Sequence, residues 1–449
     1  MTPRFPRRNS LRPSLPWFLF AGLLLAAAPA WAEGEPLVPL FNGENLDGWV
    51  NVNCAPETFT VRDQMIVCTG VPTGVLRTDR HYENFILELE WKHLHAGGNA
   101  GLFVWSDPLT APGVPFTRSI EVQILDGRNS ETYTSHGDIF AIHGAKLTPD
   151  RPHPRGAMRC LPSEWRCRPA GQWNHYRVTC RDGVIKLEVN GKEVSGGYDC
   201  LPRKGYICLE SEGSEVHFRN IRIHELPSTD PPAAEVAEVA RGFRSLYTGL
   251  NLDGWRADPG HEGHWKPNDW RLDYDGNSQA DDKHLWTEEE FADFTLICDW
   301  RFTGKPQPTQ RPLILPSGRQ ATDDRGDPKT VEVMDAGDSG IYLRGTGKAQ
   351  VNIWCWPVGS GEVYGYRTDA NMPPEVRAGV TPRVAADNPP GRWNRFEITM
   401  KGERLTVVLN GQTVIDEAHL PGVPPRGPIA LQHHGDPIQF ANLFIKELD

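Results

Sequence analysis

The sequence predicts an all-β protein that contains two divergent copies of one sandwich domain. Many short segments alternate apolar and polar residues with a period of two, which is typical of half-buried strands. Gly and Pro are frequent (44 and 39 residues), as expected where many turns join short strands. A set of sequence blocks also occurs twice in the same order, which indicates a duplicated domain.

Residues 1–32 are predicted to be a signal peptide. A basic start (Arg4, Arg7, Arg8, Arg12) precedes an apolar run from Trp17 to Ala30, and Ala30-Trp31-Ala32 supplies small residues for cleavage after Ala32. This run is short for a bilayer span, and no later stretch is apolar for long enough. We therefore expect a secreted or periplasmic protein without a membrane span.

Composition narrows the classes of ligand. The formal net charge is −11 and Lys and Arg are scattered, which argues against a nucleic-acid partner. The 15 Trp residues offer flat faces on which sugar rings stack, although most single Trp residues are expected in the core. Nine cysteines in an exported protein predict disulfides, with Cys160 and Cys167 as one pair that could close a small loop.

The duplicated blocks define two domains, at residues 33–226 and 242–449. Pro-rich and Ala-rich residues 227–241 separate them and are expected to form a linker. The matching blocks are Leu40–Trp49 with Leu246–Trp255, Asn99–Val104 with Asp338–Leu343, Gly171–Val194 with the block that starts at Gly391, and Val216–Leu226 with Ile438–Leu448.

Each copy is predicted to fold as two packed antiparallel sheets, one of which forms a concave face. Strands are expected where side chains alternate, as in Phe85–Trp91 and Ile185–Val189. Asp182-Gly183 and Asn190-Gly191 predict tight turns, and the second copy has Lys401-Gly402 and Asn410-Gly411 in the corresponding places. The second copy also contains an insertion, Gly304–Lys329, which we interpret as a surface loop that borders a cleft or contacts the other domain.

The segment Ser119–Asp126 is the best candidate for a functional strand. Glu121 and Gln123 are two residues apart and share one face, whereas Val122 and Ile124 point to the other. A carboxylate beside an amide suits sugar hydroxyls, and the carboxylate can act as a base. Asp126 joins this face only if a bulge intervenes. The alternative is an edge of solvated polar residues.

This strand lacks the acids of ordinary glycosidases. Sandwich-fold glucanases carry Glu-x-Asp-x-x-Glu, whereas Gln123 and Asp126 stand in the second and third of these positions here. Retaining hydrolysis needs two carboxylates across the scissile bond. The second copy has Gln350 and Asn352 on the matching strand and no carboxylate there. We therefore expect no ordinary two-acid hydrolysis on this strand.

Histidines supply further candidates. His136 and His143 follow the Glu121 strand closely, and a histidine near a carboxylate can be a base, an acid or a metal ligand. In the second copy, His433 and His434 stand where the first copy has Ser211 and Glu212. The alternative for each is a hydrogen-bonded loop residue. This exchange predicts that the two copies differ in activity.

Taken together, the motifs resemble those of the 3-keto-disaccharide hydrolase domain family. The resemblance rests on Leu-Phe-Asn-Gly-x-x-Leu-Asp-Gly-Trp, Glu-Val-Gln-Ile-Leu-Asp at Glu121–Asp126, Gly-x-Trp-Asn, Leu-Asn-Gly and a closing Phe-x-Asn-Ile strand. The second copy keeps the family's late motif as Leu431-Gln432-His433-His434-Gly435 and a form of Gly-x-Ile-Tyr-Gly around Tyr364. The resemblance covers nearly all of residues 33–449. It implies two tandem concanavalin A-like jelly-roll sandwiches.

The resemblance also implies cleavage of glycosides that are already oxidised at carbon 3. The ketone acidifies the hydrogen on carbon 2, so that a base removes it and the neighbouring glycosidic oxygen leaves; water then adds. We expect Glu121 or His143 as the base in the first copy and His434 as base or polar anchor in the second. Substrate contacts are expected from Gln123, Asp126, Asn352, Tyr364, Gln432 and His433. A divalent metal would suit the enolate, but the sequence contains no legible ligand set.

Two other classes of function compete with this one. Duplicated sandwiches also serve as glycan-binding modules, in which a second copy raises avidity. The divergence of the acids and the clustering of cysteines in the first copy fit a structural protein of the cell surface. Sugar binding without turnover would distinguish the binding module from the enzyme.

Overall fold

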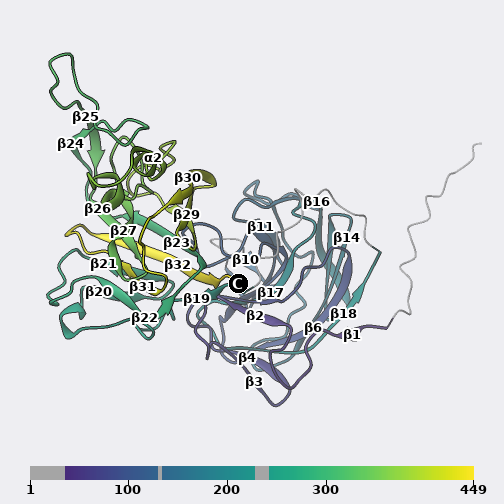
Figure 1. Ribbon diagram of the computed structural model, residues 1–449. Helices are drawn as coiled ribbons and strands as arrows, with labels where there is room; N and C mark the ends of the chain where they lie inside the picture. Colours follow the sequence, from purple (N-terminus) through teal and green to yellow (C-terminus); the bar gives the residue numbers. More distant parts are fainter. Residues whose placement is uncertain (1–35, 130–133, 228–241) are drawn as a thin grey trace, which may run out of the picture. The chain divides into compact units, whose positions relative to one another are not determined.

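A computed structural model describes residues 36–129, 134–227 and 242–449, which form two β-sandwiches (Figure 1). The predicted signal peptide and nearly all of the predicted linker lie outside these residues. Each sandwich has two antiparallel sheets, so the predicted all-β class is confirmed.

The first sandwich contains a nine-stranded and a seven-stranded sheet. The first of these has the order β12-β16-β15-β14-β6-β18-β4-β3, with β1 paired to β18, and the second has the order β13-β11-β8-β7-β17-β5-β2. The nine strands are β1 (Val38–Pro39), β3 (Phe59–Arg62), β4 (Met65–Cys68), β6 (Phe85–His93), β12 (Lys146–Pro149), β14 (Asn174–Arg181), β15 (Val184–Val189), β16 (Lys192–Leu201) and β18 (Val216–Glu225). The seven strands are β2 (Trp49–Val52), β5 (Gly74–Thr78), β7 (Asn99–Ser106), β8 (Ser119–Leu125), β11 (Ile139–Ile142), β13 (Arg159–Cys160) and β17 (Tyr206–Ser211). A separate pair is formed by β9 (Arg128–Asn129) and β10 (Thr134–Ser135).

The core of the first sandwich lies between its two sheets. Val122 and Ile124 of β8 are fully buried in it, as the alternation on this strand predicts, together with Leu102 of β7 and Leu87 of β6. Burial of one such side chain contributes roughly 1.5–3 kcal/mol to folding. The other face of β7, β8 and β17 carries the polar residues Glu121 and Gln123 beside apolar ones such as Phe103 and Cys208.

The second sandwich contains an eight-stranded and a four-stranded sheet. Their orders are β20-β21-β32-β23-β28-β29-β30, with β19 paired to β32, and β22-β31-β26-β27. The eight strands are β19 (Arg244–Ser245), β20 (Trp265–Asn268), β21 (Arg271–Tyr274), β23 (Phe294–Phe302), β28 (Asn394–Lys401), β29 (Arg404–Leu409), β30 (Gln412–His419) and β32 (Ile438–Glu447). The four strands are β22 (Leu285–Phe291), β26 (Asp338–Leu343), β27 (Thr346–Trp354) and β31 (Gly427–Leu431). Three short helices are η2 (Pro259–His261), α1 (Tyr364–Arg367) and α2 (Pro374–Gly379).

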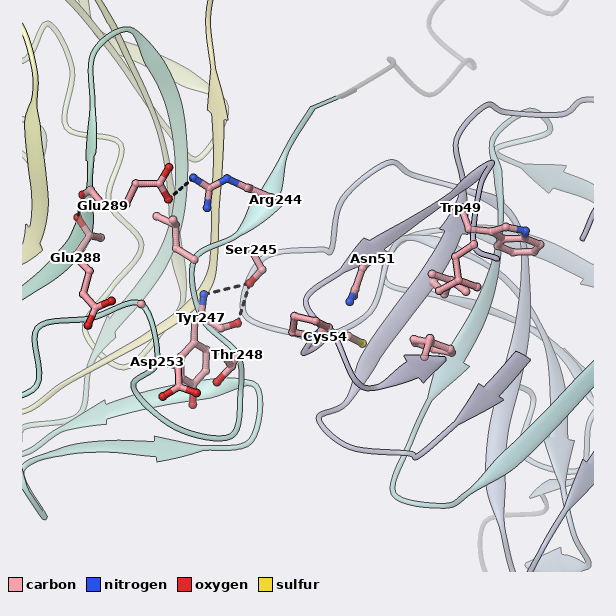
Figure 2. Close-up of a pocket in the computed structure, with 17 residues that line it drawn as sticks. Trp49, Asn51, Cys54, Arg244, Ser245, Tyr247, Thr248, Asp253, Glu288 and Glu289 are labelled. Atoms are coloured by element: carbon pink, nitrogen blue, oxygen red, sulfur yellow. Dashed lines mark hydrogen bonds and ion pairs between the residues drawn. The ribbon is translucent and has the colours of Figure 1, made fainter. Parts of the chain in front are cut away.

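The repeated Leu-Asp-Gly-Trp block begins the second sandwich. The Arg244 guanidinium of β19 pairs with the carboxylate of Glu289 of β22 at 2.6 Å, and the Ser245 hydroxyl bonds with the backbone of Tyr247 (Figure 2). The Trp255 indole donates to the Leu246 carbonyl at 2.8 Å and is buried. This tryptophan therefore serves the core and is not a sugar platform.

The predicted tight turns form where glycine is required. Asp182 and Gly183 join β14 to β15 with φ values of 52° and 75°, and Asn190 and Gly191 join β15 to β16 with 48° and 81°. Positive φ at both central residues matches the right-handed twist of the flanking strands, which is why Asn-Gly and Asp-Gly occur there.

The insertion at Gly304–Lys329 is more ordered than a plain loop. Its first part forms β24 (Gln307–Pro312), which pairs with β25 (Thr330–Asp335) along six residues. Figure 1 shows this hairpin extending away from the sheets of the second sandwich. The prediction of a surface segment is correct, but alternating residues on both arms turn it into a two-stranded ribbon.

The prediction of disulfides is wrong. All nine cysteines lie within the described residues, and each is a free thiol. Seven of them are buried, and only Cys167 and Cys355 are partly exposed. A buried cysteine packs as a small apolar residue, which accounts for free cysteines on core strands.

In the described part of the chain, no helix is both long and apolar enough to cross a membrane.

Candidate active site

The outer face of the seven-stranded sheet carries the polar residues of the first sandwich. Glu121 and Gln123 of β8 both lie on this face, opposite Phe103 and Gly101 of β7 respectively. Their exposed fractions are only 6% and 4%. A solvated polar edge would be far more exposed, so this alternative does not describe the strand.

A second carboxylate reaches Glu121 from another strand. In the order β8-β7-β17, Gly101 lies between Glu121 and Glu210 of β17. A Cβ atom at Gly101 would lie 2.8 Å from Glu210 Oε2 and 3.0 Å from Glu121 Oε1. The two carboxyl groups therefore converge over the one residue of β7 that has no side chain.

A third carboxylate and two amides surround this pair. The Asn99 amide of β7 donates to Glu212 Oε2, and Gln123 Nε2 donates to Asn99 Oδ1 at 2.9 Å. These bonds hold Glu212, which follows β17 directly, against the same face. The group Glu121, Glu210 and Glu212 is called the carboxylate triad below.

Burial and mutual repulsion favour the protonated forms of the triad. Burial raises the pKa of Glu121 well above its usual range, and the neighbouring Glu212 raises it further. Burial also raises the pKa of Glu210, with added repulsion from Glu121 and Glu212. The pKa of Glu212 is raised by burial and lowered in part by the hydrogen bond from Asn99. Like charges this close cannot all ionise, so the triad retains protons near neutral pH.

A cavity of about 400 Å³ opens over the triad. His143, which follows β11 with a φ of 51°, lines it and stacks on Phe116 with ring centres 6.2 Å apart. Burial lowers the pKa of His143, so the ring is neutral at neutral pH. Arg159 also lines the cavity, with its guanidinium 3.9 Å from the centre of the Phe140 ring. The cavity thus combines acids, a neutral imidazole, a cation and apolar walls.

Two candidate residues lie elsewhere. The Asp126 carboxylate accepts hydrogen bonds from the backbone N–H groups of Gly97 and Ala170, at 3.0 and 3.1 Å, and does not line the cavity. The pairing of β7 with β8 has no bulge that would turn Asp126 onto the Glu121 face, so it lies apart from this cavity, and its contact with substrate stays a prediction. His136 is fully buried against Trp165, with ring centres 4.2 Å apart, and also lies outside the cavity.

Glu210 and Glu212 are the functional candidates that sequence reasoning missed. In the sequence, Glu212 stands out only as the counterpart of His434. The signal that could have found them is the repeat itself, because Leu209-Glu210 aligns with Leu431-Gln432 of the late motif in the second copy. The absence of a second acid on β8 is correct, but the partner acid comes from β17.

The second sandwich has amides at the positions of the acid pair. Gln350 of β27 lies opposite Tyr342 of β26, and Gln432 follows β31 beside Gly340. Gln350 Nε2 donates to Gln432 Oε1 at 2.7 Å, and a Cβ atom at Gly340 would lie 2.3 Å from Gln350 Nε2. The pair therefore meets over Gly340 as the acids meet over Gly101, but neither member can ionise.

The position of Glu212 is taken by His434. Its Nδ1 atom lies 3.8 Å from Asp436 Oδ2, and this carboxylate raises the pKa of His434. Asp338 of β26, the counterpart of Asn99, is largely buried, which raises its pKa to about 6 although His434 opposes the shift. A raised pKa increases the protonated fraction of His434 near neutral pH, so less of it is free to accept a proton, which suits the side chain to an anchoring role.

The other candidates of the second sandwich are spread over its sheet and edge. His433 bonds with the Tyr274 hydroxyl through Nδ1, and its backbone N–H donates to His284 Nδ1 at 3.1 Å. Asn352 is 3% exposed, and its Nδ2 atom has no hydrogen-bond partner among the described residues. Tyr364 begins α1, is 44% exposed and packs edge-on against Trp354. The structure thus brings Gln432 to Gln350 and leaves Tyr364 at the periphery.

Among residues 36–129, 134–227 and 242–449, no group of three or more His, Cys, Asp or Glu side chains is arranged to hold a metal ion. The described part of the chain therefore offers no such ligand set for the divalent metal that would suit the enolate.

Comparison with known proteins finds similar sequences and similar folds. The chain is similar to the 3-keto-disaccharide hydrolase of Bacteroides thetaiotaomicron, with 23% identity over 43% of this chain and 80% of the relative. Among solved structures, it is similar to a candidate glycosyl hydrolase of Parabacteroides distasonis (TM-score 0.34, 23% identity, 42% of this chain and 94% of that one). It is also similar to the carbohydrate-binding module CBM66 of Bacillus subtilis (TM-score 0.29, 12% identity, 40% and 96%).

The match to a protein family covers both sandwiches. Residues 36–224 and residues 242–446 each match the 3-keto-alpha-glucoside-1,2-lyase-like domain. The predicted duplication and the concanavalin A-like sandwich class agree with this match. The chain therefore belongs to the 3-keto-alpha-glucoside-1,2-lyase-like domain family and carries one copy of the domain in each sandwich.

Proposed function

We propose that the first sandwich cleaves glycosides that carry a ketone at carbon 3, by removing the proton on carbon 2. The observation that carries this proposal is the convergence of Glu121 and Glu210 over Gly101, inside a cavity. A base for this step works best when its pKa lies near the working pH. Burial shifts the carboxyl groups in that direction.

In this proposal Glu121 takes the proton from carbon 2 as an ionised carboxylate. Electrons of the broken C–H bond form a carbon–carbon double bond with carbon 1, and the glycosidic oxygen leaves and takes up a proton. Glu210 remains protonated beside Glu121 and can supply that proton. Water then adds across the double bond, so that the net reaction is hydrolysis of the glycoside.

Other residues of the cavity stabilise the charge that develops. The enolate oxygen at carbon 3 needs a hydrogen-bond donor or a cation, and Arg159 lines the cavity near Glu121. His143 is neutral and can hold a sugar hydroxyl or replace Glu121 as the base. Phe116 and Phe140 line the same cavity and offer apolar faces to a sugar ring.

The decisive test is product formation from a 3-keto-glucoside by the purified protein, with and without added divalent metal. Turnover that disappears in Glu121→Gln, and that washes solvent deuterium into carbon 2, would support the proposal. Glu193→Gln, an exposed glutamate on β16, is the matched control. Turnover that persists in Glu121→Gln but disappears in His143→Ala would assign the base to His143.

A glycan-binding function is the second candidate. The amide pair of the second sandwich favours it, because Gln350 and Gln432 form hydrogen bonds but cannot abstract protons. Binding of a sugar by the protein without any turnover of a 3-keto-glucoside would favour this candidate over the enzyme. As residues 1–32 lead us to expect export, we place either function outside the cytoplasm.

A further inference from the structure

The outer face of the four-stranded sheet in the second sandwich combines aromatic rings with neutral amides. Tyr342 of β26 and Trp286 of β22 both lie beside Ala430 of β31. Because Ala430 is small, the two rings approach each other across it, with centres 5.7 Å apart and planes at 42°. Both rings are only partly buried. They form a half-exposed aromatic platform on the sheet.

The amide pair extends this platform into a chain of hydrogen bonds. Gln350 donates to Gln432 at 2.7 Å, and Gln432 Nε2 donates to the Tyr342 hydroxyl at 3.0 Å. His284 lies edge-on to the Tyr342 ring at 4.9 Å. Amides and a phenol offer donors and acceptors without charge, which is the pattern that sugar hydroxyls require.

A cavity of about 560 Å³ continues from the platform across the sheet edge. His284 and Trp286 line it, so the platform and the cavity are continuous. This volume lies within the roughly 300–1,000 Å³ of small-ligand sites. Three carboxylates also line the cavity, those of Asp258, Asp282 and Glu290. They face a single guanidinium, that of Arg256. Because these carboxylates repel acidic sugars, neutral sugars are the ligands that suit the cavity.

We propose that this face is a separate binding site for neutral, unoxidised oligosaccharides. Trp286 and Tyr342 stack on the sugar rings, the amides of Gln350 and Gln432 hold hydroxyls, and the adjoining cavity accepts further sugar units. The proposal does not depend on turnover in the first sandwich, because an unoxidised sugar has no ketone to acidify carbon 2.

The test is titration calorimetry of the full protein with maltopentaose, cellopentaose and xylopentaose, and with trigalacturonate as the acidic probe. We expect at least one neutral pentasaccharide to bind and trigalacturonate not to bind. Trp286→Ala and Tyr342→Ala should each weaken binding at least tenfold. Trp173→Ala, which removes a partly buried indole of the first sandwich that contacts Arg219, should change the affinity less than twofold.

A substitution that keeps the shape of the site guards against loss of folding. Gln350→Met retains the length of the side chain but forms no hydrogen bond, and should weaken binding about threefold to tenfold with an unchanged unfolding temperature. The proposal is overturned if none of the three pentasaccharides binds, or if binding survives both Trp286→Ala and Tyr342→Ala. Equal binding of trigalacturonate would also overturn it.

Discussion

The two sandwiches place their central side chains in the same geometry, but the pair in the first can ionise and the pair in the second cannot. In the first, Glu121 and Glu210 meet over Gly101, and burial favours their protonated forms. In the second, Gln350 and Gln432 meet over Gly340 and bond to each other. The backbone arrangement is therefore separable from the chemistry, because one sheet face holds either an acid pair or an amide pair.

The difference also extends to the partner beside each pair. The first sandwich joins an amide to a carboxylate, Asn99 to Glu212, whereas the second places the carboxylate of Asp338 near the imidazole of His434. In each sandwich an ionisable side chain, Glu212 or Asp338, therefore lies beside a polar or charged one. This difference supports our proposal that the first copy transfers a proton and the second holds hydroxyls.

The largest effect should come from neutralising the first acid pair. Glu121→Gln should lower turnover of a 3-keto-glucoside at least about 100-fold, because a positioned base contributes roughly 10²–10⁴-fold. Steady-state kinetics of the purified variant measures this, with Glu193→Gln as control. If the variant retained more than a tenth of the parent activity, Glu121 would not be the base, and the proposed difference in proton transfer between the copies would be contradicted.

Converting the second pair into the first should cost stability in a pH-dependent way. Gln350→Glu with Gln432→Glu should lower the free energy of unfolding by about 2 kcal/mol at pH 8 and by much less at pH 5, because buried carboxyl groups can stay protonated at the lower pH. Urea unfolding at the two pH values measures the difference. Equal losses of unfolding free energy at pH 5 and pH 8 would show that the side chains over Gly340 are not crowded as they are over Gly101.

A methyl group at Gly101 should separate the acids without unfolding the sheet. In Gly101→Ala the new Cβ would displace the ends of Glu121 and Glu210, which are flexible. We expect turnover to fall about tenfold while the unfolding free energy changes by about 1 kcal/mol or less. Kinetics and urea unfolding of one preparation separate the two effects. A large loss of stability with normal turnover of the folded fraction would contradict this role of Gly101.

The smallest effect should appear in the pH dependence of stability. Folding raises the pKa of Glu121, so the folded protein holds this proton more tightly than the unfolded chain. The resulting stabilisation is complete below the unfolded-state pKa of about 4.5 and is lost as pH rises through the higher folded-state pKa. Glu121→Gln should therefore gain about 1 kcal/mol relative to the parent between pH 5 and pH 8, measured by thermal unfolding. A constant difference between the two proteins would show that Glu121 titrates normally.

The sequence predicted the fold better than the site, and the reason is physical. A period of two reveals which residues of one strand share a face, so Glu121 and Gln123 could be placed together and Val122 assigned to the core. Periodicity does not reveal which strands are neighbours. Glu210 approaches Glu121 only because β7 lies between their strands and contributes a glycine there.

Predictions that depended on cellular context fared worse than those that depended on pattern. Disulfides were expected from an exported location, yet cysteines such as Cys180 and Cys298 are free thiols that occupy core positions. Asp126 was placed near the substrate by its nearness in sequence to Glu121, but its carboxylate serves two backbone N–H groups instead.

The free thiols give each sandwich its own reporter of local opening. Burial raises the pKa of Cys180 in the first sandwich and of Cys298 in the second, so that almost no reactive thiolate is present in the closed state. An alkylating reagent reaches these sulfurs only when the surrounding strands open. The labelling rate of each cysteine therefore measures how often its own sandwich opens, without any label or mutation being introduced beforehand.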